Sequence, residues 1–312
     1  MIDVLTVGRV SVDLYAEEPG VGFDGQQHFR KSVGGSPTNV AVAAARLGLH
    51  AAVATKVGDD GFGEYVRRRL AEWGVDTSFV GVEPAGLTPL ALAALDPPEN
   101  PRIAFYRQQA PDTCLVASDV PEATVRDCRL LWISFGALST GTTADAVRTW
   151  LDRRERRAHT VLDLDYRPSM WPDRALARRE AIRAIDHSTV VVGNREECEV
   201  AVGETDPDLA ADRLLERGVT LAIVKMGGDG VLLATASERT RVAPHPIDLV
   251  CGLGAGDAFG GALCLGLLEG WDLERMGGFA NAAGAIVASR LTCADAMPSA
   301  DEVRALTGGG VA

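Results

Sequence analysis

The stretch 252–259 contains the residues with the clearest potential for chemistry. Gly252, Gly254 and Gly256 stand at alternate positions, so the backbone can approach a ligand closely and leave its N–H groups open. A helical pattern follows, and a helix N-terminus attracts anions because its first N–H groups are unpaired and its dipole is positive there. Asp257 stands in this first turn, where a carboxylate would repel a bound phosphate. It therefore either takes part in catalysis or caps the helix, and the motif by itself leaves both interpretations open.

A second glycine-rich stretch, 34–39, also precedes an expected helix. Ser36 is a good N-cap and Pro37 suits the first helical position. The pair Gly34-Gly35 has no use in a helix, so it indicates close approach of the backbone to a ligand. Asn39 would then project from the first turn with both a donor and an acceptor, which match a sugar hydroxyl. The alternative is an ordinary helix start without a ligand.

Polar residues also follow three expected strands. Asp13 comes after the first strand, and its carboxylate could accept from two hydroxyls of a polyol or stabilise a turn. Asn194 and Glu197 follow the run 190–192, and they could orient the water shell of Mg²⁺ or form a capping box. Lys225 ends a further strand before a glycine-rich turn. A plain hairpin would explain those glycines but not the lysine.

The hydrophobic pattern predicts the scaffold that positions these residues. Apolar runs rich in β-branched residues alternate with amphipathic helical segments, which is typical of a parallel sheet with helices on both faces, the doubly wound α/β class. The expected strands are 2–7, 51–57, 130–135, 160–164, 189–192, 221–225 and 231–233. The expected helices are 37–47, 62–73, 143–157, 175–185, 208–217, 257–269 and 276–289.

Two segments interrupt this alternation. Residues 14–32 and 87–115 contain β-like runs separated by Pro, Gly and Asp, without a helical pattern. Each could supply two strands of a small sheet that leaves the main domain and covers a cleft, and the alternative is irregular surface loops. No repeat or linker divides the chain. We therefore expect one domain over residues 1–312, with these two segments inserted as a lid.

Composition and charge exclude several classes of partner. The 312 residues include 43 acidic and 31 basic side chains, and the net charge of −12 argues against nucleic acid or an anionic membrane. No apolar run approaches the roughly 20 residues that span a bilayer, and the N-terminus lacks the basic region of a signal peptide. Six scattered cysteines without a C-x-x-C pair fit a reduced cytoplasm and do not fit zinc. A P-loop is absent, and 252–257 has Asp where a dinucleotide motif needs its third Gly.

With these motifs in place, the chain resembles the ribokinase (PfkB) family of carbohydrate kinases over essentially its full length. Gly34-Gly35 and the Gly-Ala-Gly-Asp motif at 254–257 stand in the family's order, about 220 residues apart, and the pair is far more specific than either motif. The resemblance implies a ribokinase-like fold with a small β lid. It also implies phosphorylation of a sugar hydroxyl by ATP with Mg²⁺.

The resemblance assigns roles to individual residues. Asp257 would take the proton from the attacking hydroxyl, and because the helix terminus would hold it ionised, it could act without a raised pKa. The anion hole for the transferring phosphoryl group would be the N–H groups of Gly254, Ala255 and Gly256. The sugar would be held by Asp13, Gly34, Gly35 and Asn39. The nucleotide would be bordered by Asn194, Lys225, Gly228, Gly230 and Asn281, and Mg²⁺ would be organised through water by Asn194 and Glu197.

Further strings narrow the resemblance to a subfamily. Tyr-Arg-Gln at 106–108, Asp-Leu-Asp-Tyr-Arg-Pro at 163–168 and Asp-Ala-Met-Pro at 295–298 are similar to kinases that phosphorylate O6 of 5-dehydro-2-deoxy-D-gluconate in myo-inositol catabolism. A sugar acid needs a cation for its carboxylate. Arg107 on the expected lid and Arg167 beyond a strand end are the candidates, since arginine can grip a carboxylate with two bonds, and Arg9 is a weaker one. The alternative for each is a surface ion pair.

One stretch departs from the family pattern. Many members bind a monovalent cation through Asp-Thr-Thr just before the Gly-Ala-Gly-Asp motif, but here Cys251-Gly252-Leu253 lacks the carboxylate, which argues against activation by K⁺. The alternative activities are a 2-dehydro-3-deoxygluconokinase, a neutral-sugar kinase of the fructokinase or ribokinase type, and a non-catalytic sugar-binding regulator. Pairing of two lids would give a homodimer, although no sequence feature establishes one.

Overall fold

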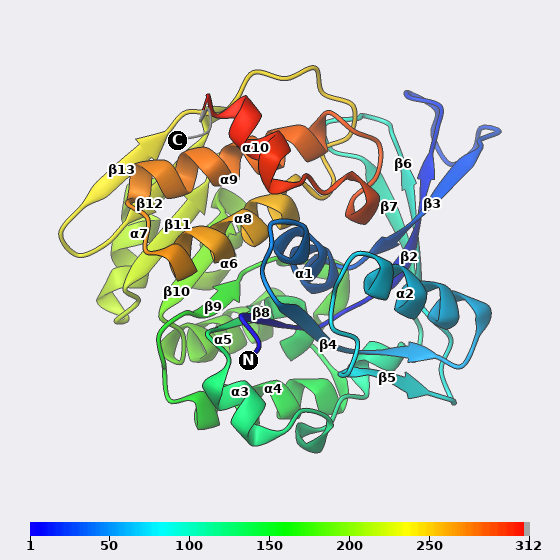
Figure 1. Ribbon diagram of the computed structural model, residues 1–312, viewed down its shortest axis with the longest axis horizontal. Helices are drawn as coiled ribbons and strands as arrows, with labels where there is room; N and C mark the ends of the chain where they lie inside the picture. The colour runs from blue at the N-terminus through cyan, green and yellow to red at the C-terminus, as the bar shows by residue number, and fades with distance from the viewer. Residues whose placement is uncertain (309–312) are drawn as a thin grey trace.

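A nine-stranded sheet forms the centre of the molecule (Figure 1). The computed structural model describes residues 1–308. The strand order of this sheet is β13-β12-β11-β10-β9-β8-β1-β4-β5. All neighbouring pairs from β11 to β5 are parallel, whereas β12 is antiparallel to β11 and β13 is antiparallel to β12. The bounds are β1 Val4–Val7, β4 Ala51–Gly58, β5 Val80–Glu83, β8 Leu130–Ser134, β9 Thr160–Asp163, β10 Val190–Asn194, β11 Leu221–Lys225, β12 Val231–Ala234 and β13 Arg239–Val242. The prediction of a mostly parallel α/β sheet is confirmed.

Helices cover both faces of this sheet because its strands are apolar on both sides. In β1, Val4 packs into one core while Leu5 and Val7 pack into the other. The first core is covered by α1 Ser36–Arg46, α2 Gly61–Glu72, α8 Ala255–Glu269, α9 Leu273–Ala288 and α10 Ala300–Leu306. The second is covered by α3 Glu122–Asp127, α4 Gly141–Arg154, α5 Arg174–Asp186, α6 Arg195–Val202 and α7 Pro207–Glu216.

Small residues let α8 pack closely against α1. A Cβ on Gly261 would lie 2.3 Å from the Cβ of Ala43, and one on Gly260 would lie 2.8 Å from the indole of Trp132. The two helices therefore approach with almost no side chain between them at these positions. This contact matters for the site because it brings the first turns of α1 and α8 side by side.

A second, four-stranded sheet stands beside the main one, at the right in Figure 1. Its order is β3-β2-β6-β7, with bounds β2 Ser11–Ala16, β3 Phe29–Gly34, β6 Leu90–Ala94 and β7 Arg102–Tyr106. Each interrupting segment supplies two strands, as the sequence predicts, although β2 begins earlier than residue 14. Two antiparallel hairpins are joined through the parallel pairing of β2 with β6.

The start of α1 differs from the sequence expectation. Gly35, with a φ of 98°, is the N-cap, and Ser36 is the first helical residue. The Ser36 hydroxyl donates to Asp163 Oδ2 at 3.3 Å instead of capping the helix. The prediction of a Ser36 cap is therefore wrong, because a distant carboxylate competes for that hydroxyl. Short elements such as α3, α6 and α10 were also absent from the expected helices.

All six cysteines are free thiols. Within residues 1–308, no helix is both long enough and apolar enough to cross a membrane.

Candidate active site

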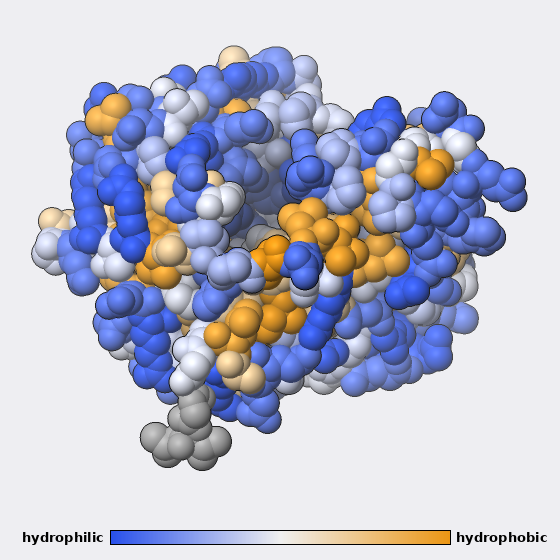
Figure 2. Space-filling view, turned by 90° about the horizontal axis from the view of Figure 1, so that it is seen from above, coloured by the Kyte–Doolittle hydropathy of each residue, from blue (hydrophilic) through white to orange (hydrophobic). Residues whose placement is uncertain are grey.

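A cavity of about 440 Å³ lies between the carboxyl ends of the central strands and the small sheet. Asp163, Asn194 and Lys225 reach it from the ends of β9, β10 and β11. Ala91 and Phe105 face it from the small sheet. Figure 2 shows the molecule hollowed near the centre of its upper face, with hydrophilic and hydrophobic side chains on different sides of the hollow. The carboxyl edge of an open parallel sheet is where such proteins bind ligands.

Asp257 lies in the first turn of α8, against the first turn of α1. Gly254 caps α8 in the left-handed conformation at φ 81°, and a Cβ there would lie 2.6 Å from Cys293 Sγ, so only glycine fits. Asn39 Nδ2 donates to Asp257 Oδ2 at 2.7 Å. The Oδ1 of Asn39 is buried and has no hydrogen-bond partner among residues 1–308. The arrangement fixes one oxygen of Asp257 and leaves an unsatisfied acceptor next to it in the cavity.

The pKa of Asp257 is raised to about 6. Burial is the main cause and the neighbouring Asp165 adds to it, while the hydrogen bond from Asn39 and the charge of Arg9 act in the opposite direction. The helix terminus therefore does not keep the pKa of Asp257 at its ordinary value. Burial destabilises the carboxylate form of Asp257 by more free energy than the helix terminus and the hydrogen bond stabilise it. A carboxylate with a pKa of about 6 is still ionised at neutral pH and is a stronger base than an exposed aspartate.

Asp165 lies between two arginines on the cavity wall. Arg9 Nη1 donates to its Oδ2 at 2.5 Å, and Arg167 Nη2 lies 3.0 Å from its Oδ1. These two charges hold the pKa of Asp165 below its usual range, in spite of burial. Ser134 Oγ also donates to it, at 3.1 Å. Asp165 is therefore a permanent anion that neutralises one of two arginines.

Asp163 has a different environment from Asp165. Burial raises its pKa, and Lys225 lowers it, with the Lys225 Nζ 3.9 Å from Asp163 Oδ1. That Oδ1 is buried and has no hydrogen-bond partner. Lys225 also reaches the glycine-rich turn before α8, since a Cβ on Gly256 would lie 3.4 Å from its Nζ. The two side chains place one cation and one under-satisfied carboxylate beside the turn before α8.

Asp13 projects from β2 into the cavity. Its carboxylate accepts from Ser11 Oγ at 2.6 Å and from the Tyr15 hydroxyl at 3.1 Å, and burial raises its pKa. A Cβ on Gly34 would lie 2.0 Å from Asp13 Oδ2, and one on Gly35 would lie 2.4 Å from the carbonyl oxygen of Arg9. The glycine pair thus makes room for Asp13 and for the turn after β1. The close packing of Asp13 and Arg9 therefore explains why glycines stand at positions 34 and 35, whereas the sequence had suggested only close approach to a ligand.

Asn194 and Glu197 form a capping box at the start of α6. Asn194 Oδ1 accepts from the Glu197 N–H at 2.9 Å, and Glu197 Oε2 accepts from the Asn194 N–H at 2.7 Å. Both residues also line the cavity. The cap uses one carboxylate oxygen of Glu197 and leaves the other, so the geometry accommodates both interpretations given from the sequence.

The residues present fit a magnesium ion held mainly by phosphates and water. Within residues 1–308 no three His, Cys, Asp or Glu side chains form a cluster that could enclose a metal ion. Mg²⁺ commonly takes only one or two protein carboxylates together with substrate phosphates and water. The Asp163 oxygen that lacks a hydrogen bond and the Glu197 oxygen not used by the capping box provide such carboxylates on the cavity wall.

Three of the expected nucleotide contacts do not line this cavity. Gly228 lies in the short helical turn after β11 with no atom near its Cβ position. A Cβ on Gly230, which has a φ of 87°, would lie 2.1 Å from the Val242 carbonyl oxygen. Asn281 Nδ2 donates to the carbonyls of Val242 and Ala243, at 3.2 and 3.0 Å. Gly230 and Asn281 are thus accounted for by packing around the end of β13, and Gly227 lines the cavity instead.

Arg107 also lies outside the main cavity. Its Nη2 is 2.8 Å from Oδ1 of the buried Asp112, whose Oδ2 accepts from the Val10 N–H at 3.0 Å. Arg107 and Arg9 both border a small neighbouring cavity of about 10 Å³. The ion-pair alternative given for Arg107 is therefore realised, but with a buried partner.

Several cavity residues had no assigned role from the sequence. Asp163 and Asp165 appeared only within a longer string, although two aspartates at the end of a buried strand are a signal that could have been used. Tyr15 and Cys293 lie against one another, with the Tyr15 hydroxyl oxygen 2.8 Å from Cys293 Sγ. They are 278 residues apart, so no local pattern could have paired them.

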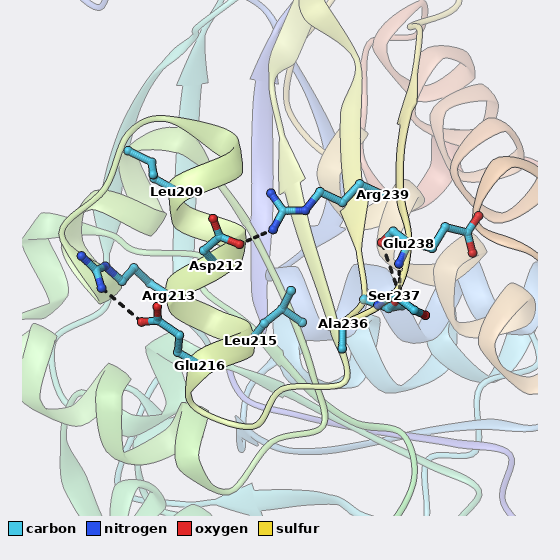
Figure 3. A pocket seen from close by; sticks show the side chains of 10 residues that line it. Leu209, Asp212, Arg213, Leu215, Glu216, Ala236, Ser237, Glu238 and Arg239 are labelled. Atoms are coloured by element: carbon cyan, nitrogen blue, oxygen red, sulfur yellow. Dashed lines mark hydrogen bonds and ion pairs between the residues drawn. The ribbon is translucent and has the colours of Figure 1, made fainter.

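A larger cavity of about 540 Å³ lies at the opposite end of the sheet (Figure 3). It is bounded by α7 and by the turn between β12 and β13. Because β12 is antiparallel to β11, this turn is remote from Lys225. Four of its five charged side chains are paired with one another, Arg239 with Asp212 and Arg213 with Glu216. Size alone therefore does not identify the site.

Comparison with known proteins agrees with this geometry. Residues 1–300 match the model of the pfkB family carbohydrate kinases. The chain belongs to the PfkB family. A 5-dehydro-2-deoxygluconokinase of Geobacillus thermodenitrificans is 32% identical over 309 residues, which cover 97% of this chain and 92% of the relative. The enzyme of the same name from Halalkalibacterium halodurans is 32% identical over 312 residues, covering 97% and 94%.

Solved structures give the same family fold. An E. coli protein assigned as a ribokinase II, in complex with ATP and Mg²⁺, superposes on this PfkB kinase with a TM-score of 0.90 at 26% identity, covering 99% of both chains. Aminoimidazole riboside kinase from Salmonella enterica superposes with a TM-score of 0.83 at 25% identity, covering 97% of this chain and 98% of the other. The predicted family and ribokinase-like fold are confirmed, and the protein is a carbohydrate kinase.

Proposed function

We propose that this kinase transfers the terminal phosphoryl group of ATP to a primary hydroxyl of a sugar acid, O6 of 5-dehydro-2-deoxy-D-gluconate. The observation that carries the proposal is Asp257, a buried base held by Asn39 at the glycine-rich start of α8. The names of the relatives supply the substrate. The arginines around Asp165 supply positive charge for an acid.

On the acceptor side, Asp257 takes the proton of the attacking hydroxyl. Its fixed oxygen bonds to Asn39, so the other oxygen is available to the sugar. Asp13 and the unpartnered Oδ1 of Asn39 hold sugar hydroxyls, because both are acceptors on the cavity wall. Gly34 and Gly35 let the chain turn close to this subsite. Water is excluded by the small sheet, which we propose acts as a lid.

On the donor side, the glycine-rich turn receives the phosphoryl group. We expect the N–H groups of Gly254, Ala255 and Gly256 to stabilise the negative charge that develops during transfer, and Lys225 adds a cation beside Gly256. Mg²⁺, held through Asn194, Glu197 and the phosphates, would neutralise part of that charge. The neighbour solved with ATP and Mg²⁺ supports both ligands for this chain. Gly228, Gly230 and Asn281 remain predicted to border the nucleotide through the β11–β12 turn and the segment after β13.

The decisive variant is Asp257→Asn. Loss of a general base lowers turnover by roughly 10²–10⁴-fold, while the anion hole and Lys225 still bind ATP. Phosphate transfer measured with the sugar acid, and ATP binding measured by calorimetry, give the two readouts. Asp212→Asn, on the remote α7, is the matched control and should retain full turnover. Near-normal turnover of Asp257→Asn would remove this residue as the base.

A substrate panel separates the proposal from its alternatives. It contains 5-dehydro-2-deoxy-D-gluconate, 2-dehydro-3-deoxy-D-gluconate, fructose and ribose, with ATP consumption as the readout. We expect the highest kcat/KM with the first. A preference for the second acid would change the substrate but keep the class, and a neutral sugar in first place would overturn the sugar-acid proposal. No ATP consumption with any sugar would support a binding regulator.

Two further expectations accompany the proposed function. All six thiols are free, as a reducing cytoplasm requires, and we place the kinase there. A homodimer formed through the small sheets stays a prediction, which light scattering of the purified protein would test.

A further inference from the structure

Arg9 occupies an unusual position for an arginine. It follows β1 directly, its side chain is only 10% exposed, and it borders the main cavity. A buried guanidinium needs compensating acceptors, because an unpaired charge away from water is costly. Arg9 is 156 residues from Asp165, its one ion-pair partner among the described residues. The remaining N–H groups of the Arg9 guanidinium are therefore donors that a ligand could use.

Only one side of the guanidinium is used within the protein. Nη1 donates to Asp165, and within residues 1–308 the Nε–H and Nη2–H groups of Arg9 have no hydrogen-bond acceptor. Nε and Nη2 form the edge with which arginine grips a carboxylate through two parallel bonds. The edge that suits a carboxylate is thus the edge that remains available.

Arg9 and Arg167 share a single directly bonded carboxylate. Asp165 serves Arg9 and Arg167 together, so these three groups carry a net charge of one positive unit. Asp257 already bears a raised pKa and lies within electrostatic reach of Arg9. A carboxylate bonded to the free edge of Arg9 would give this arginine a second direct partner without moving Asp165.

The other two arginines are less suited to this task. Arg107 lies outside the main cavity, where Asp112 pairs with it. Arg167 has a side chain that is 41% exposed, and it follows β9, which neighbours the β10 strand of the proposed magnesium residues. Arg9 instead lies beside β2, the strand that carries Asp13, and so on the acceptor side of the cavity.

We infer that Arg9, oriented by Asp165, binds the carboxylate of the sugar acid and makes this kinase select acids over neutral sugars. The inference rests on the proposed function and deepens it, since it assigns the specificity of that site to one residue. Asp165 acts as a positioning residue: its bond to Nη1 turns the other edge of Arg9 toward the substrate.

The test compares the sugar acid with its primary amide, which has the same shape and no charge. In Arg9→Met, the KM for the acid should rise roughly 10- to 100-fold, because hydrogen bonds between two charged groups are lost. The KM for the amide should change by less than about three-fold, and kcat should fall little with either substrate. Arg107→Met is the matched control, and its ratio of acid to amide kcat/KM should equal that of the wild type.

Folding of the variants is checked by thermal unfolding, because Arg9→Met leaves Asp165 with Arg167 and Ser134 alone. If that variant does not fold, Arg9→Lys replaces it. Lysine retains the charge but has no fork, so the acid should still lose most of its advantage over the amide. In Asp165→Asn the same advantage should shrink while amide turnover persists.

The outcomes separate the inference from the proposed function. Equal loss of activity toward acid and amide in Arg9→Met would show that Arg9 serves Asp257 or the phosphoryl group, and would overturn the inference alone. A selective loss in Arg107→Met instead would move the role to Arg107. A wild-type enzyme that uses the amide as well as the acid would also overturn the inference. Failure of the wild type to phosphorylate the acid would overturn the proposed function and the inference together.

Discussion

Replacing Asn39 with leucine should move the pH at which the kinase becomes active. Asn39 donates to Asp257 at 2.7 Å, and this bond lowers a carboxyl pKa that burial raises to about 6. Leucine has a similar shape but no donor, so the burial stays while the bond disappears. A hydrogen bond to a charged group is worth about 1.5–3 kcal/mol, and one pKa unit corresponds to about 1.4 kcal/mol. The pKa of Asp257 should therefore rise by roughly 1–2 units.

The direction of the activity change follows from which form is the base. Only ionised Asp257 accepts a proton, so a higher pKa means that the acid limb of kcat/KM moves to higher pH. With a limb near 7.5 in place of about 6, the ionised fraction at pH 6 would fall roughly 15-fold, while at pH 9 it would hardly change. Any lost contact between Asn39 and the sugar lowers kcat/KM equally at all pH values, and so does not shift the limb.

The assay is kcat/KM between pH 5 and 9.5, which reports the ionisations of the free enzyme. Asn281→Leu is the matched control, since among residues 1–308 the Asn281 amide donates to the carbonyls of Val242 and Ala243 and makes no hydrogen bond to Asp257, so its loss should leave the limb in place. An acid limb that stays put in Asn39→Leu, or moves to lower pH, would refute the reasoning about Asp257.

Three other predictions concern stability, packing and ion dependence. The folded-state pKa of Asp257 lies above its unfolded value of about 4, so burial of this group lowers stability increasingly as the pH rises from about 4 to 6. Asp257→Asn should therefore raise the free energy of unfolding by on the order of 2–3 kcal/mol at pH 8 but not at pH 3.5. Urea titration measures both values, and equal effects at the two pH values would contradict this prediction. Gly34→Ala should lower the free energy of unfolding by about 1–3 kcal/mol and raise the KM for the sugar, because the added Cβ would lie 2.0 Å from Asp13 Oδ2. Unchanged kinetics and an unchanged melting temperature would contradict this prediction and show that Asp13 can move freely. Replacing K⁺ with tetramethylammonium in the assay buffer should leave kcat within about two-fold of its value in K⁺, because Cys251 stands where a carboxylate would bind the ion. A much larger loss of kcat would reveal a cation site built from other groups.

The amino-acid sequence by itself determined the architecture of this protein. Apolar strands with helices between them predicted the parallel sheet, and the two segments without helical periodicity, 14–32 and 87–115, predicted the small sheet. These features are local, because hydrophobic period and turn residues report on neighbours along the chain. The Gly-Gly and Gly-Ala-Gly-Asp motifs indicated the family for a related reason: glycines mark positions where a Cβ would collide with other atoms, as it would at Gly34 and Gly254.

The tertiary structure decided how the site residues are charged and which of them meet. Asn39 and Asp257 are 218 residues apart, and their contact depends on how closely α8 packs against α1. The raised pKa of Asp257 follows from burial, which no local pattern records. In the same way Arg107, predicted from its place on the lid, is paired with Asp112, while Arg9 enters the cavity with one edge of its guanidinium available. Residue types specify which chemistry is available, but pKa values and partners depend on distances and solvent exposure that exist only after the chain has folded.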